Sequence, residues 1–130
     1  MKKLLQFKFF FTILSISDCL FIIFLSLKEF KFTKTVISIN KSFEIESLVH
    51  CFFYFSLSLV LFLALSHDWK IKNSKMHSIF ICLSLGILLE AVQGLIIPYR
   101  SFEFSDLLSN FLGISIFYFF SKSSIFSKIK

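Results

Sequence analysis

The sequence is poor in the residues that interrupt helices or cross-link chains. It contains three Gly and one Pro among 130 residues, so its hydrophobic segments run with few breaks. The Cys residues are odd in number, lie in different segments and lack the paired spacing of a disulfide or zinc framework: Cys19, Cys51 and Cys82. We interpret them as small apolar packing residues.

Sequence motifs for common functions are missing as well. There is no nucleophile motif, no Gly-rich phosphate loop and no small-x-small cleavage site after the first apolar run. We therefore expect that first run to remain as a helix, not to be removed as a signal peptide. Outside the hydrophobic segments there is no basic face with interleaved aromatics, so the net charge of +6 does not indicate a nucleic-acid partner.

What the sequence has in abundance is hydrophobic residues. They make up 56% of the chain, Phe occurs 21 times, and the mean hydropathy is +0.82. Charged residues bound four hydrophobic segments, at about 7–27, 47–66, 76–97 and 104–121. Each is close to the roughly 20 residues with which an α-helix crosses a bilayer. The sequence predicts one all-α domain over residues 1–130, a polytopic membrane protein with four transmembrane helices in an antiparallel bundle.

Two parts of the chain fit this scheme less simply. Asp18 lies inside the first segment, where a carboxylate requires a partner. The connection at 28–46 is long enough to hold structure outside the bilayer. Its local alternation of polar and apolar residues is compatible with a short strand or with a stretch lying on the membrane surface.

The distribution of Lys and Arg predicts the orientation. Nine of the 14 lie at the N-terminus, in the 67–75 loop and at the C-terminus: Lys2, Lys3, Lys8, Lys70, Lys72, Lys75, Lys122, Lys128 and Lys130. The other five lie in the two remaining connections, where acidic residues offset them: Lys28, Lys31, Lys34, Lys41 and Arg100. Because positive residues favour the cytoplasmic side, both termini are expected to be cytoplasmic.

With this orientation, polar residues in three segments fall at a similar depth near the outer surface. The second segment carries His50 with Tyr54 one turn further in, and Arg100 lies in the connection before the fourth segment. The third and fourth carry polar pairs spaced i, i+3 and i, i+4, which lie on one face of a helix: Glu90 with Gln93 and Asp106 with Asn110. Asp106 falls in a first helical turn, where the helix dipole stabilises an anion. A carboxylate near the bilayer centre costs roughly 2.5–3.5 kcal/mol, so Glu90 is expected to face the bundle interior.

These residues carry a resemblance to a known family. The stretches "ESLVHCFFYFSLSLVL" and "GILLEAVQGLIIPYRSFEFSDLLSNFLGI" resemble the VanZ-like family of small bacterial integral membrane proteins. The family pattern is a His at a helix start, then Glu-x-x-Gln, an Arg, and Asp-x-x-x-Asn leading into a Gly. The matching residues, in order, are His50, Tyr54, Glu90, Gln93, Arg100, Asp106, Asn110 and Gly113. The family often has a Lys three residues before the His, where this chain has Ser47.

The resemblance implies a location and a biological setting. The expected location is the bacterial cytoplasmic membrane, with several membrane passes. The family takes its name from a member associated with low-level resistance to teicoplanin, a lipoglycopeptide antibiotic. A role in the cell envelope is the function that the resemblance implies.

Three functions are compatible with the polar residues. They can form a network that fixes helix packing. They can bind an anionic lipid headgroup or a lipid-linked envelope ligand, through Arg100, Gln93, Asn110 and Tyr54. They can also form an enzyme site in which His50, Glu90 and Asp106 are the candidate catalytic residues. Neither a metal site nor another cofactor is predicted, because Glu-x-x-Gln lacks a second His.

Overall fold

The computed structural model describes residues 9–27, 39–98 and 102–122, of which residues 39–45 are described by their backbone alone. Helix α2 spans Phe10–Leu27 and helix α3 spans Ile39–Leu63. A π-helical turn, η1, continues α3 over Ala64–Asp68. Helix α4 spans Ser74–Ile96 and helix α5 spans Phe104–Phe120. These described ranges contain no β-strand.

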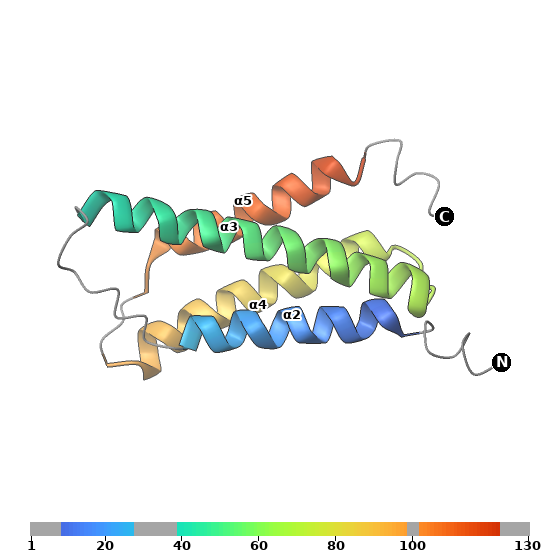
Figure 1. Ribbon diagram of the computed structural model, residues 1–130, viewed down its shortest axis with the longest axis horizontal. Coiled ribbons are helices and arrows are strands. Elements are labelled where there is room, and N and C mark those ends of the chain that lie inside the picture. Colours follow the sequence, from blue (N-terminus) through green and yellow to red (C-terminus); the bar gives the residue numbers. More distant parts are fainter. Residues whose placement is uncertain (1–8, 28–38, 99–101, 123–130) are drawn as a thin grey trace.

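The four α-helices lie side by side along one long axis (Figure 1). Helix α3 packs against all three others and most extensively against α5, to which it is parallel, whereas consecutive helices are antiparallel. The first turn of α2 and the last turn of α5 lie at one end of the bundle. The last turns of α2 and α4 and the first turn of α5 lie at the other, which we call the distal end.

The lengths of the helices fit a membrane. The segments Phe10–Leu27, Glu46–Asp68 and Ser74–Ile96 are long and apolar enough to cross one. Helix α5 is apolar as well but has 17 residues, a length of about 26 Å at 1.5 Å per residue. The prediction of an all-α membrane bundle is confirmed, and the two described chain ends lie at the same end of it.

The distribution of side chains is that of a protein whose solvent is lipid. Large apolar side chains face outward on every helix, among them Ile13, Phe52, Leu95 and Phe119, each at least 66% exposed. Ser, Asp, Glu, Gln and Asn side chains are buried between the helices. In water this arrangement would expose a large apolar surface, whereas in a bilayer the lipid tails cover it.

The helix boundaries differ from the predicted ones mainly in the second segment. The prediction that this helix begins at 47 is wrong, because α3 begins at Ile39. Residues 39–46, "INKSFEIE", contain no Gly or Pro, so nothing in the backbone stops the membrane helix from continuing outward. The apolar part of the helix still begins at Glu46, so His50 remains about one turn inside the apolar span.

The end of the bundle opposite the distal end is closed by hydrogen bonds between α2 and η1. One carboxylate oxygen of Asp68, Oδ2, accepts a hydrogen bond from the backbone N–H of Thr12 and another from its hydroxyl, both at 2.7 Å. The Trp69 indole N–H donates to the same hydroxyl at 3.0 Å. Thr12 lies in the first turn of α2, whose N–H groups have no partner within the helix, so Asp68 caps that helix.

Candidate functional site

The close approach of α3 and α5 brings the candidate residues of these two helices together. Gly113 of α5 lies against the α3 backbone: a Cβ on this residue would stand about 3.0 Å from both the carbonyl carbon of Cys51 and the backbone nitrogen of Phe55. A side chain at this position would therefore force the two helices apart. The residue before Cys51 is His50, whose side chain reaches Asp106 and Asn110 in the first turns of α5.

His50 contacts two polar residues of α5, one at each ring nitrogen. Its Nδ1 lies 3.1 Å from Oδ1 of Asn110, and its Nε2 lies 3.8 Å from Oδ2 of Asp106. An amide oxygen accepts hydrogen bonds and does not donate them, so the imidazole carries a proton on Nδ1 in this contact. The contact therefore fixes the ring orientation and presents Nε2 to Asp106.

A fourth residue, Glu46, belongs to the same cluster. It lies one turn before His50 on α3, and a side-chain oxygen of Glu46, a ring nitrogen of His50 and an oxygen of Asp106 all lie within 4.8 Å of one another. The three differ in burial: Asp106 is buried, His50 is intermediate and Glu46 is exposed. Glu46 was not among the candidate residues predicted from the sequence. The signal that would have found it is the i, i+4 spacing to His50, which places both residues on one helix face.

Tyr54 lies one turn further into the bundle and is almost fully buried, with 1% of its surface exposed. Its ring packs against Gly86 of α4, where a Cβ would come within 3.3 Å of Tyr54 Cε1 and 3.4 Å of Asn110 Nδ2. Gly86 thus lets the tyrosine ring and the asparagine amide meet at the surface of α4. This places Tyr54 beside the cluster of Glu46, His50, Asp106 and Asn110, as part of the packing beneath it.

Glu90 and Gln93 are both buried on the inner face of α4, 2% and 3% exposed. Glu90 lies one turn beyond Gly86 toward the distal end. The Gln93 amide donates to the backbone carbonyl of Ser26 in α2, at 2.6 Å. That carbonyl belongs to the last turn of α2, where carbonyl groups receive no hydrogen bond from an N–H group of the same helix. Gln93 therefore joins α4 to α2, on the side of the bundle away from α5.

Two other polar residues from the sequence analysis have different outcomes. Arg100 lies outside the described residues, so its predicted contact with an anion stays a prediction. Asp18 has the partner that its position in a membrane span requires, because the hydroxyl of Ser56 in α3 donates to its Oδ2 at 3.1 Å. This contact joins α2 to α3 and does not involve the cluster of Glu46, His50, Asp106 and Asn110.

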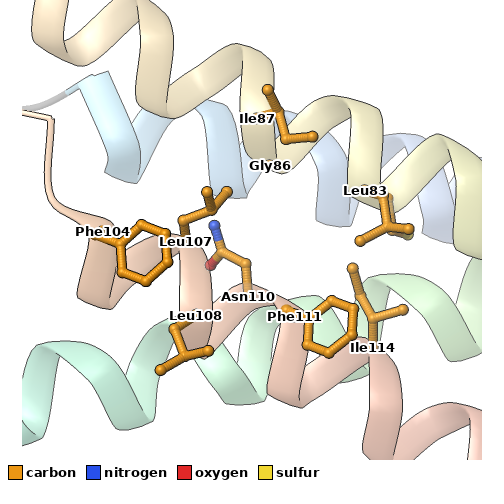
Figure 2. A pocket seen from close by; sticks show the side chains of 10 residues that line it. Leu83, Gly86, Ile87, Phe104, Leu107, Leu108, Asn110, Phe111 and Ile114 are labelled. Carbon is orange, nitrogen blue, oxygen red and sulfur yellow. The ribbon is translucent and has the colours of Figure 1, made fainter.

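An apolar cavity of about 230 Å³ lies between α4 and α5, next to Asn110 (Figure 2). Its walls are the side chains of Cys82, Leu83, Ile87, Phe104, Leu107, Leu108, Phe111 and Ile114, with Gly86 and Asn110. Asn110 points from α5 toward Gly86, between the apolar residues. Asn110 therefore belongs both to the polar cluster, through Oδ1, and to the wall of the cavity.

Comparison of the chain with protein-family models, with curated proteins and with solved structures returns no match. The resemblance to the VanZ-like family therefore remains a prediction from the motifs.

Proposed function

We propose that this chain is a VanZ-like protein of the bacterial cell envelope that binds a lipid or lipid-linked ligand at the distal end of its bundle. By the positive-inside rule, the distal end faces the outer leaflet of the cytoplasmic membrane. The observation that carries the proposal is the position of Asn110. Its side-chain amide bonds to His50 on one side and lines an apolar cavity on the other. One amphiphilic molecule can therefore place its polar part at the polar cluster and its apolar part in the adjacent cavity.

The composition of the polar cluster supports a function beyond helix packing. Interhelical hydrogen bonds in membranes contribute about 0.6 kcal/mol on average, and hydroxyl or amide side chains are sufficient to make them. The contact between Ser78 and the Ser58 carbonyl, 3.2 Å long, is one such bond in this bundle. A buried carboxylate such as Asp106 and a partly buried imidazole such as His50 are more costly to place inside a membrane bundle than these groups, and they more often mark a functional site.

The size of the cavity favours part of a lipid as its occupant. Pockets that enclose a drug-sized molecule measure roughly 300–1,000 Å³, and this one is smaller. A lipoglycopeptide antibiotic is far larger than such molecules, whereas a segment of one acyl or prenyl chain fits an apolar volume of this size. An influence on teicoplanin-type susceptibility would then act through the lipid or precursor bound, without enclosure of the antibiotic.

Arg100 supplies the proposed preference for an anionic headgroup. The described cluster contains two carboxylates and an imidazole, so it does not itself attract an anion. In the sequence, Arg100 is four residues after the last residue of α4 and four before the first residue of α5. A guanidinium group there can bind a phosphate or carboxylate bidentately.

The experiment that tests lipid binding is to fill the cavity. Ile87 lines it and Leu88 does not, although both are more than half exposed and adjacent on α4. We expect Ile87→Trp to reduce the lipid retained by the detergent-purified protein in native mass spectrometry, and Leu88→Trp to leave it unchanged. Equal retention in the two variants would show that the cavity does not hold the lipid.

A second pair of variants separates ligand binding from a packing network. If the polar residues bind a ligand, Glu90→Gln and Arg100→Lys change envelope-drug susceptibility while abundance and melting temperature stay near wild type. If they only hold the helices together, stability and phenotype fall in parallel. A phenotype that always follows abundance would therefore contradict the proposal.

The positioned imidazole supports a second candidate, an enzyme acting on a lipid-linked envelope precursor. Contacts at both ring nitrogens hold His50 as a general acid or base is held. An enzyme would alter the precursor profile of a deletion strain, measured by mass spectrometry. Wild type would restore the profile and His50→Ala would not, whereas a binding protein would leave covalent precursor structures unchanged.

A further inference from the structure

We propose that Glu46, His50 and Asp106 bind a divalent metal ion. The three residues come from two helices, and one possible ligand atom of each lies within 4.8 Å of those of the other two. Imidazole nitrogen combined with carboxylate oxygen suits ions such as Zn²⁺ and Mn²⁺. This inference goes beyond the proposed function, because an ion can bind here whether or not a lipid is present.

The distance between His50 and Asp106 fits two ligands of one ion better than a direct hydrogen bond. Nε2 and Oδ2 are 3.8 Å apart, and N–H···O hydrogen bonds measure about 2.7–3.2 Å. Two atoms that each lie about 2.1 Å from one ion are roughly 3–4 Å apart. Glu46 is the exposed member of the three, so its side chain has the freedom to close the remaining distance.

Asn110 prepares His50 for this role. Its Oδ1 accepts the proton on Nδ1 at 3.1 Å, which leaves the lone pair of Nε2 directed toward Asp106. Hydrogen bonds of this kind to the second ring nitrogen are general in protein metal sites, where they fix the tautomer and the ring orientation. Asn110 is therefore a positioning residue, and it does not itself bind the ion.

Charge balance favours a cation at this position. The side-chain oxygens of Glu46 and Asp106 lie within 4.8 Å of each other, a separation at which two carboxylates repel. A divalent ion neutralises both carboxylates. Three protein ligands also leave coordination positions open, through which the ion could hold a phosphate group of a lipid at the distal end.

The first test is metal binding by the full chain, purified in detergent and stripped with a chelator. We expect isothermal titration with Zn²⁺ or Mn²⁺ to give one saturable site. The variants Glu46→Gln, His50→Gln and Asp106→Asn should each lose it, and Asn110→Ala should weaken it by about 10–100-fold. Glu103→Gln, a carboxylate outside the cluster just before α5, should bind like wild type.

A second measurement does not depend on the folding of any variant. Electron spin-echo spectroscopy of Mn²⁺ bound to the wild-type chain should show coupling to an imidazole nitrogen, as His50 predicts. The proposal is overturned if the wild type has no saturable site, if the bound ion shows no nitrogen coupling, or if all three ligand variants bind like wild type. Because these measurements need no lipid, their failure would not count against lipid binding in the cavity.

Discussion

The side-chain amide of Gln93 in α4 donates a hydrogen bond to the backbone carbonyl of Ser26 in α2, and the two atoms are 2.6 Å apart. Both residues are buried. The bond joins the last turns of two neighbouring helices at the distal end, where the α2 carbonyls have no partner in their own helix. It also gives a residue that the sequence analysis selected for ligand binding a direct role in packing.

Variants of Gln93 should show this packing role. Gln93→Leu removes the bond and should lower the free energy of unfolding by about 0.6–1.7 kcal/mol. Gln93→Glu should cost more, because an ionised carboxylate has no proton to donate and would face the carbonyl oxygen of Ser26. Thermal unfolding in detergent measures both effects. Equal stability of the Leu and Glu variants would contradict a donor role for this amide.

The contact between Gly113 and the α3 backbone predicts a specific intolerance to a methyl group. Gly113→Ala places its Cβ against the backbone at Cys51, which no side-chain rotation relieves. We expect a loss of about 1–3 kcal/mol in unfolding free energy, as for other overpacked sites. Ser115→Ala is the matched control, since the Ser115 hydroxyl bonds to Phe111 within α5. A wild-type melting temperature for Gly113→Ala would refute the close approach of α3 and α5.

At the opposite end of the bundle, Asp68 should contribute to stability as a cap of α2. Asp68→Ala leaves the Thr12 N–H without its acceptor and should lower the free energy of unfolding by about 0.5–2 kcal/mol. Thr12→Val removes the two hydrogen bonds of the hydroxyl, to Asp68 and from Trp69, and should cost less because the bond from the backbone N–H to Asp68 remains. Lys72→Ala, an exposed change in the following connection, serves as control in the same melting experiment. An effect of Asp68→Ala no larger than that of Lys72→Ala would exclude the cap.

The predicted orientation can be measured by labelling single cysteines in a chain whose three native Cys are replaced by Ala. Lys72 and Glu103 are both exposed and lie in connections at opposite ends of the bundle. A membrane-impermeant maleimide should label Glu103→Cys in intact cells and Lys72→Cys only after lysis. The reverse pattern would place both termini outside the cytoplasm and the distal end inside.

The fold could be predicted from the sequence because the signals that define membrane helices are local. Segments of about 20 apolar residues, bounded by charges, predicted the four helices, and each predicted segment coincides with a helix along most of its length. The start of α3 was not predictable from hydropathy. Residues 39–46 are polar yet helical, and hydropathy reports where a chain meets lipid, not where a helix ends.

The candidate site could be predicted from the sequence only in part. His50, Asp106 and Asn110 were expected to lie at one depth, and the structure brings them into contact. Glu46 was missed, because a charged residue at the edge of an apolar segment is usually assigned to the connection. Gln93 lies at the expected position along its helix, but its amide bonds to α2. Depth follows from position along a helix, whereas the direction of a side chain depends on how that helix is rotated in the bundle.

The sequence by itself determined that this protein is a bundle of apolar helices with polar residues gathered near one end. Hydrophobicity and helical periodicity are local properties of the sequence, so they predict helices without knowledge of which helices pack together. Tertiary structure decided which polar groups meet. The close approach of α3 to α5 at Gly113 brings His50 into contact with Asp106 and Asn110. The packing of α4 against α2 places the Gln93 amide within hydrogen-bond distance of the Ser26 carbonyl. Such contacts depend on helix rotation and separation, which are fixed only when all four helices pack together.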